Sequence, residues 1–275
     1  MFPGGKLGLR LSILTVFLVL LWTTGPHFYN GRTTGCLECH SAHHEGWGTC
    51  VDCHRGDPRT QRIQIAHHRL VPGEYACFTL PESPVVETGQ RLIDISGCRR
   101  CHQTGQQGNG LASNLDGSLD KKMPEVLADA IKKPAVFMPH FNFQETDVTR
   151  LVNAILASSA GYALKSTDLG QAIHFEEDKE DSDDVFSRNC GGCHRILTQR
   201  IGGIGKGDMG PNLSGIFSDF YFQTFKGRKS WDSTGLGQWL KNPRDIRTNA
   251  QMPPVHLKKD EFGHLLRILD SYVSS

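Results

Sequence analysis

Four copies of the string Cys-x-x-Cys-His constrain this chain more than any other feature. Together they take up eight of its nine cysteines. They are Cys36-Leu37-Glu38-Cys39-His40, Cys50-Val51-Asp52-Cys53-His54, Cys98-Arg99-Arg100-Cys101-His102 and Cys190-Gly191-Gly192-Cys193-His194. The composition would supply roughly 0.01 such strings by chance. A disulfide framework or a zinc module would not place a histidine directly after every cysteine pair.

The spacing of each string has a chemical reason. Two thiols three positions apart lie on one turn of the chain and can add to the two vinyl groups of a single haem, while the adjacent imidazole binds the iron. The sequence therefore predicts four covalently bound c-type haems. The predicted attachment residues are Cys36, Cys39, Cys50, Cys53, Cys98, Cys101, Cys190 and Cys193, and the predicted proximal iron ligands are His40, His54, His102 and His194. The alternative is a redox or zinc Cys-x-x-Cys motif that happens to precede a histidine. This coincidence would have to occur in all four strings.

The N-terminus has the pattern of an export signal. Lys6 and Arg10 precede a mostly apolar run over residues 11–22, which has the length of a signal-peptide core and is shorter than a membrane span of about 20 residues. Residues 23–26 (Thr-Thr-Gly-Pro) offer a poor cleavage site. Residues 1–30 are thus either a cleaved signal peptide or an uncleaved membrane anchor. In both cases we expect a periplasmic chain, since c-type haem is attached outside the cytoplasm in bacteria.

The uneven spacing of the strings predicts three modules. The second string begins 14 residues after the first, whereas the third and fourth follow after a further 48 and 92 residues. We assign residues 31–80 to a two-haem module, 81–165 to a domain around the third haem and 166–275 to a domain around the fourth. About 50 residues cannot build an ordinary apolar core, so the porphyrins must serve as the core of the first module. Residues 80–84 and 164–184 are expected to be linkers.

The third and fourth strings look like two copies of one design. A short helical lead is expected before each string, at residues 87–93 and 185–186. Apolar residues at helical spacing predict a terminal helix in each copy. They are Val148, Leu151, Val152 and Ile155 in one copy and Phe262, Leu265, Leu266 and Leu269 in the other. A Met-Pro pair precedes each terminal helix, and a helical pattern stopped by proline, over residues 127–134 and 236–243, precedes each pair.

This order of helix, string, loop, Met-Pro pair and C-terminal helix resembles the class I cytochrome c fold over residues 85–160 and 183–275. The resemblance implies a mainly α chain, with a multihaem-type module followed by two class I cytochrome c-like domains. Residues 210–215 (Gly-Pro-Asn-Leu-Ser-Gly) are similar to the Gly-Pro-x-Leu loop of that family, which implies that Pro211 packs near the proximal side of the fourth haem. The domain around the third haem is expected to lack this loop.

Methionines are the expected sixth ligands of the third and fourth irons, because a thioether is a soft ligand that favours ferrous iron. For the third iron the candidates are Met123 and Met138, and we favour Met138, which directly precedes the terminal helix where the class I family places its ligand. For the fourth iron Met252 holds the equivalent place, with Met209 as the other candidate.

Histidines are the expected sixth ligands of the first two irons, because residues 31–80 contain no methionine. The candidates form two adjacent pairs, His43-His44 and His67-His68. Neighbouring residues point in different directions, so one member of each pair is expected to bind iron. We choose His43 for the second iron and His67 for the first.

The overall charge excludes a nucleic-acid binder, since 30 basic and 29 acidic residues leave a net charge of +1. With every iron six-coordinate, the chain is predicted to relay electrons between redox proteins and not to act as an enzyme. The alternatives are a haem-based oxyanion reductase using Arg55, Arg62 and Arg69, and a dihaem peroxidase. Cys77, the ninth cysteine, is interpreted as a buried inert thiol, with a thiolate ligand or a redox-active thiol as the alternatives.

Over its whole length the chain is also similar to c-type cytochromes associated with selenite- and tellurite-reduction gene clusters in anaerobic respiring bacteria. The residues behind this likeness are Cys53-His54-Arg55-Gly56-Asp57-Pro58, Ala66-His67-His68, Cys98-Arg99-Arg100-Cys101-His102 and Asn242-Pro243-Arg244. The likeness implies an exported respiratory role.

Overall fold

The computed structural model describes residues 35–44, 46–135, 137–163 and 184–270. The described residues divide into two compact units, one made of residues 35–44, 46 and 56–68 and the other of residues 47–55, 69–135, 137–163 and 184–270. The predicted signal peptide or anchor lies outside the described residues. None of the helices among the described residues is long and apolar enough to cross a membrane.

The smaller unit is held together by backbone hydrogen bonds and contains two short helices, η1 (Gly35–Glu38) and α3 (Ile63–Ala66). The Gly35 amide donates to the Pro58 carbonyl at 2.9 Å, and the Asp57 amide donates to the Ala66 carbonyl at the same distance. None of the residues of η1 or α3 is buried. An apolar core of ordinary side chains therefore does not explain how these two helices are fixed.

The larger unit contains two separate apolar cores, and we call the parts around them the first lobe (residues 69–163) and the second lobe (residues 184–270). The elements of the first lobe are η2 (Gly73–Thr79), α4 (Pro84–Ile95), η3 (Cys98–Arg100), α5 (Ser118–Lys121), α6 (Pro124–Lys132) and α7 (Glu145–Ser159). Those of the second lobe are α8 (Val185–Asn189), β1 (Ile196–Thr198), β2 (Gly202–Ile204), α9 (Ser233–Lys241), α10 (Pro243–Ile246) and α11 (Lys259–Leu269). Helix α2 (Cys50–His54) belongs to the same unit.

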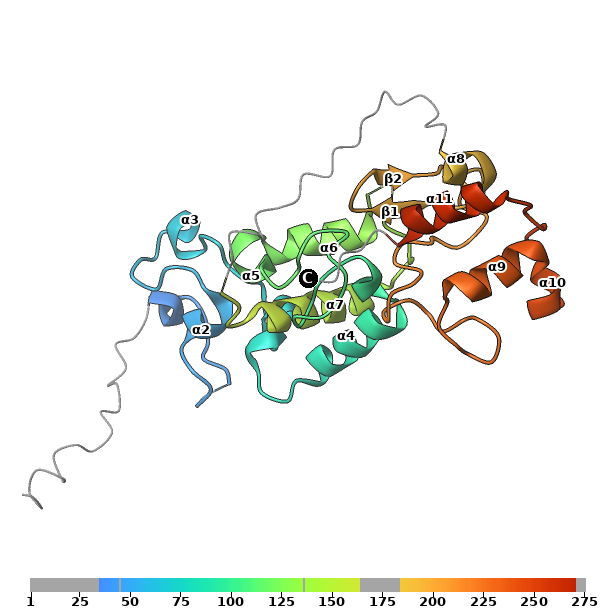
Figure 1. The fold of residues 1–275 in the computed structure, drawn as a ribbon. Coiled ribbons are helices and arrows are strands. Elements are labelled where there is room, and N and C mark those ends of the chain that lie inside the picture. Colours follow the sequence, from blue (N-terminus) through green and yellow to red (C-terminus); the bar gives the residue numbers. More distant parts are fainter. Residues whose placement is uncertain (1–34, 45, 136, 164–183, 271–275) are drawn as a thin grey trace, which may run out of the picture. The chain divides into compact units, whose positions relative to one another are not determined.

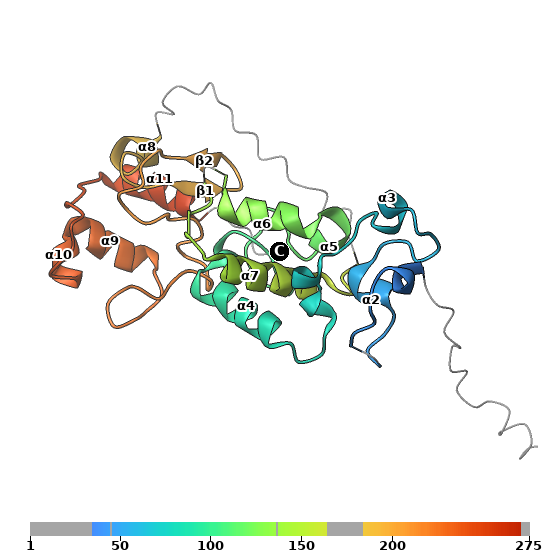
Figure 2. The same cartoon turned by 180° about the vertical axis from the view of Figure 1, so that it is seen from behind.

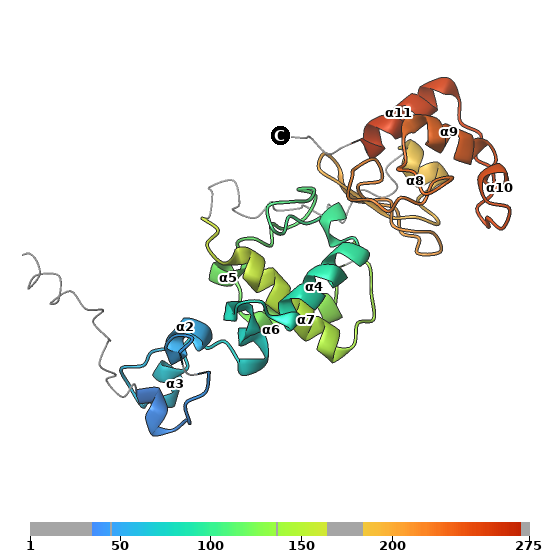
Figure 3. The same ribbon diagram turned by 90° about the horizontal axis from the view of Figure 1, so that it is seen from below.

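The first lobe is organised by the close crossing of α4 and α7, which lie side by side in Figures 1 and 3. Gly89 sits at this crossing, where a Cβ would overlap the Arg150 carbonyl, so the sequence needs its smallest residue here. Ile93 and Val152 fill the core between the helices. Tyr75 of η2 is buried in the same core, so residues near 75 pack with the first lobe, although composition placed the boundary at residue 80.

The second lobe packs α8 and α11 together with a two-stranded antiparallel hairpin, in which Ile196 pairs with Ile204 and Thr198 with Gly202. Figure 2 shows the hairpin beside these two helices from behind. Phe186, Ile196 and Leu265 are almost fully buried in its core. The Asp184 side chain begins α8 by accepting hydrogen bonds from the amides of Phe186 and Ser187.

The sequence patterns locate the helices well. The expected leads become α4 and α8, the patterns stopped by proline become α6 and α9, and the terminal helices become α7 and α11. The prediction of a mainly α chain is confirmed for the described residues. The division into one two-haem module and two cytochrome c-like domains stays a prediction.

Candidate haem-attachment sites

Each of the four strings forms a single helical turn. In the first, third and fourth strings the histidine amide donates to the carbonyl of the first cysteine, at 2.9, 3.0 and 2.9 Å. The second string is the whole of α2. A turn closed in this way brings both cysteine side chains and the following histidine close together, which is the arrangement that attachment to one macrocycle requires.

Three of the four predicted proximal histidines are oriented by a backbone carbonyl further along the chain. The Nδ1 of His54 lies 3.0 Å from the Val71 oxygen, that of His102 lies 2.8 Å from the Ser113 oxygen, and that of His194 lies 2.8 Å from the Pro211 oxygen. A carbonyl only accepts, so Nδ1 carries the proton in each pair. Nε2 is then left with its lone pair, and this is the form in which imidazole binds a metal.

Cys98, Cys101 and Cys190 of the third and fourth strings have the environment of unreactive thiols. Burial raises the pKa of Cys98 and of Cys190 to about 11, and burial also raises the pKa of Cys101. Cysteines that act as redox centres or bind bare metal ions have a lowered pKa and react as thiolates. Among the described residues, no group of three or more His, Cys, Asp or Glu side chains is arranged to hold a metal ion.

The loops after the third and fourth strings make the same set of backbone hydrogen bonds. The amides of Ala112 and Gly210 donate to the carbonyl of the second cysteine of their string, and those of Leu115 and Leu213 donate to the residue after the histidine. Asn114 and Asn212 then accept, through Oδ1, from the amide two residues on, each at 2.9 Å.

The expectation that the third string lacks the Gly-Pro-x-Leu loop is therefore wrong. Residues 112–117 (Ala-Ser-Asn-Leu-Asp-Gly) form that loop, with Ala-Ser in place of Gly-Pro. The bonds that define it come from the backbone and from the asparagine, so the first two residues can change. The shared Asn-Leu-x-Gly pattern was the sequence signal that could have revealed it.

The methionine candidates differ in their surroundings. Met252 packs against the second core, and the Trp239 indole donates to its sulfur at 3.0 Å. Met209 is 81% exposed. Met138 is half-buried on the loop before α7, whereas Met123 is the residue at which α6 begins. Packing thus separates Met252 from Met209, and Trp239 is a contact of Met252 that sequence reasoning missed.

The histidine candidates lie in the smaller unit together with the first string. The rings of His40 and His67 are 6.0 Å apart between centres, with an angle of 45° between their planes. His43 and His44 contact each other, with ring centres 5.0 Å apart. The second string belongs to the larger unit, so the structure does not test the assignment of His43 to the second iron.

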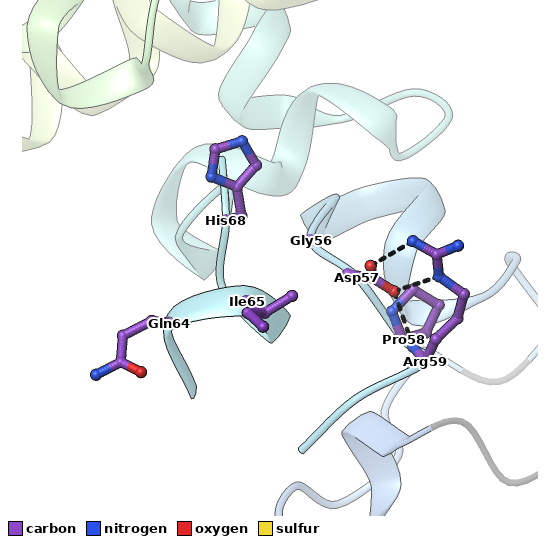
Figure 4. Close-up of a pocket in the computed structure, with 7 residues that line it drawn as sticks. All are labelled: Gly56, Asp57, Pro58, Arg59, Gln64, Ile65 and His68. Atoms are coloured by element: carbon purple, nitrogen blue, oxygen red, sulfur yellow. Dashed lines mark hydrogen bonds and ion pairs between the residues drawn. The ribbon is translucent and has the colours of Figure 1, made fainter. Parts of the chain in front are cut away.

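His68, the neighbour of His67, lines a pocket of about 510 Å³ in the smaller unit (Figure 4). Ile65 points toward the segment that carries Asp57 and Pro58 on the other side. Arg59 also lines the pocket, and its hydrogen bonds hold the pKa of Asp57 at about 2. The side chains of His67 and His68 therefore lie in different surroundings, as expected for adjacent residues.

The arginines proposed for an oxyanion site are partly engaged elsewhere. Arg55 forms an ion pair with the Asp120 carboxylate at 3.7 Å, and Arg69 donates to the Asp120 carbonyl at 2.7 Å. Arg62 belongs to the smaller unit. In the described structure these contacts favour a structural role for Arg55 and Arg69.

The residues of the four strings fit covalently bound haem better than a redox or zinc Cys-x-x-Cys site. Each string offers two cysteines and a histidine on one turn, and three of the histidines have their second ring nitrogen occupied by a carbonyl. Gly210 lies against the His194 ring, where a Cβ would collide with it. The absence of a side chain at residue 210 therefore lets the loop support the ring from behind.

Comparison with known families agrees with this chemistry. Residues 84–153 match the family model described as cytochrome C oxidase, cbb3-type, subunit III. No curated protein and no solved structure matches the chain. The matched segment contains the third string, the loop at residues 112–117 and most of α7. The match therefore supports a c-type cytochrome domain over residues 84–153, a kind of domain that holds haem covalently and transfers electrons through it.

Proposed function

We propose that this protein is an exported tetrahaem c-type cytochrome that relays electrons between redox partners in anaerobic respiration. The observation that carries the proposal is the shared frame of the third and fourth strings. The third lies in the segment that matches a cytochrome c family, and the fourth repeats its turn, its histidine–carbonyl bond and its asparagine turn. A second cytochrome c-like site in residues 184–270 is the simplest interpretation of this repetition.

The first two strings extend the same chemistry to the N-terminal part. A metal–imidazole bond is about 2.0–2.1 Å long, and the centre of the ring lies about 1.1 Å beyond the bound nitrogen. Two imidazoles on opposite sides of one iron thus have centres about 6.3 Å apart, close to the 6.0 Å between His40 and His67. This spacing supports His67 as the sixth ligand of the first iron. His43 is proposed for the second on sequence grounds alone.

Methionine and histidine ligands would set different reduction potentials. A bound haem supplies an iron that alternates between the ferric and ferrous states. Met138 and Met252 favour the ferrous state and raise the potential, whereas a second histidine keeps it lower. We therefore expect electrons to enter at the two sites with paired histidines and to leave through the two sites with a methionine.

The charge of the loaded protein indicates the kind of partner. Each haem carries two propionates, so four haems change a chain of net charge +1 into one near about −7 before the irons are counted. Complementary charge speeds the encounter of redox proteins and orients them. The partners are expected to present basic surfaces around their own redox centres.

Three measurements test the proposal on the purified protein. Haem quantification should give four haems per chain, and low-temperature EPR of the oxidised protein should show four low-spin irons, two with paired histidines and two with histidine and methionine. The reduced protein should bind no carbon monoxide. Fewer than four haems, a high-spin signal or carbon monoxide binding would reject the electron-relay function, and the last two would favour a reductase or a peroxidase.

A further inference from the structure

Asn212 links the two candidate haem sites of the larger unit to each other. We propose that Asn212 and Arg100 are positioning residues that couple the two sites. Through them, the ligands of the third site are held partly by the second lobe, and those of the fourth site partly by the first lobe. The proposal rests on the proposed function, since it assumes haem at both strings. It goes further by naming the residues through which the two sites influence each other.

Asn212 is connected to three parts of the larger unit, to two by hydrogen bonds and to one through the chain. Its carbonyl accepts from Arg100 at 3.1 Å, inside the third string. Its Nδ2 donates to the Phe137 carbonyl at 2.9 Å, directly before the predicted ligand Met138. The residue before it, Pro211, provides the carbonyl that holds His194. Asn212 is thus bonded to both predicted ligand segments of the third site and covalently joined to the support of the fourth.

Arg100 is an unusual partner because it is a buried cation. It is only 6% exposed, and its side chain lies between the Asn212 and Gly97 carbonyls and over the rings of Tyr221 and Phe222, 5.3 and 5.1 Å from their centres. None of the described carboxylates forms an ion pair with it. A buried guanidinium is costly unless its hydrogen bonds are satisfied, so the contact with Asn212 is strongly favoured.

Glycines on both sides let the two lobes approach closely. A Cβ on Gly215 would lie 2.8 Å from the Arg100 carbonyl, and one on Gly97 would lie 2.9 Å from the Phe222 ring. A Cβ on Gly203 would overlap the Phe137 ring. The two apolar cores share no residue. The junction is therefore specified by polar contacts and close backbone packing.

Asn114, the counterpart of Asn212 in the first lobe, shows that the turn alone does not require these contacts. It closes the same turn through Oδ1. Its Nδ2 contacts the Tyr162 hydroxyl at 3.4 Å, within its own lobe. The contacts of Asn212 with Arg100 and Phe137 are thus additions to a shared frame, and they make the pair of sites asymmetric.

The decisive experiment compares Asn212→Ser with Asn114→Ser in the full haem-loaded protein. Serine can still accept from the amide two residues on, but it is too short to reach the Phe137 carbonyl. The readouts are the EPR signals, the sulfur–iron charge-transfer band and the midpoint potential of each methionine-ligated haem. The signals are assigned with Met138→His for the third haem and Met252→His for the fourth.

We expect Asn212→Ser to weaken the sulfur–iron band of the third haem and to lower its potential, because Met138 loses the support of its loop. We expect Asn114→Ser to leave the fourth haem unchanged. If Asn212→Ser alters only the fourth haem, the proposal is wrong.

A second pair of variants, at Arg100 and Arg99, tests the proposal if the Asn212→Ser protein does not fold. Arg100→Gln should shift the fourth haem, whereas Arg99→Gln should not, since the Arg99 side chain bonds to Asp94 and to the Thr104 carbonyl of its own lobe. Equal effects of the two glutamine variants on the fourth haem would overturn the proposal. If the protein holds four six-coordinate haems and these tests fail, the electron-relay function stands and only the proposed coupling between the two sites is rejected.

Discussion

The ring centres of His40 and His67 lie 6.0 Å apart, with an angle of 45° between the ring planes, although 27 positions separate the two residues in the sequence. This spacing would let both imidazoles hold the same iron, as proposed above. His67 follows the last residue of α3, and its amide donates to the Ile63 carbonyl at 2.9 Å. The His67 ring thus follows directly on α3 and lies near His40 of the first string.

His67→Ala should open the first iron and His68→Ala should not. Loss of the sixth ligand leaves a five-coordinate or water-bound iron, which binds carbon monoxide once reduced. We expect about one equivalent of carbon monoxide per chain for His67→Ala and none for His68→Ala, measured by optical titration. His67→Met should instead keep the site closed and raise its potential. Carbon monoxide binding by the His68 variant alone would reverse the assignment.

His43→Ala should open the second iron in the same way, with His44→Ala as its control. The two rings contact each other, so both variants remove a similar packing interaction and differ in ligation. The check is low-temperature EPR, in which only His43→Ala should convert one low-spin signal to high spin. A high-spin signal in the His44 variant would assign that residue to iron.

Met252→Ala should remove the sulfur ligand of the fourth haem, whereas Met209→Ala should have little effect because that side chain is 81% exposed. The sulfur–iron band and the potential report the difference. Trp239→Phe should lower the potential of the fourth haem without opening it, because a donor to the sulfur makes it a weaker partner for ferric iron. A potential unchanged in Trp239→Phe would show that the indole bond does not persist in the haem-loaded protein.

Gly89→Ala and Gly263→Ala should change stability in opposite directions. At residue 89 a Cβ would overlap the Arg150 carbonyl at the crossing of α4 and α7, and overpacking of this kind costs about 1–3 kcal/mol. At residue 263 the nearest atom is the end of Arg267, 3.9 Å away, so alanine should stabilise α11 by up to about 1 kcal/mol. Denaturant unfolding of the haem-loaded variants measures both, and a stable Gly89→Ala protein would contradict the described packing.

Local patterns predicted the helices and the turns of the strings because both depend on neighbouring residues. Apolar spacing around Val148 and Leu265 located α7 and α11 with their buried faces. The loop after the third string escaped detection because its hydrogen bonds come from the backbone, which the residue types Ala112 and Ser113 do not reveal. The ring contact between His40 and His67 and the role of Asn212 depend on which segments meet in space, and no local pattern records that.

The hairpin of β1 and β2 makes the second lobe different from the first. Leu213 lies nineteen positions after His194, whereas Leu115 lies thirteen positions after His102. The longer span holds the hairpin, and Gly203 of this hairpin lies against the Phe137 ring. Among the described residues, this hairpin belongs to the second lobe and the Phe137 ring to the first. A chain with two copies of the first lobe would have no hairpin for that ring to pack against, so the contact needs one lobe of each kind.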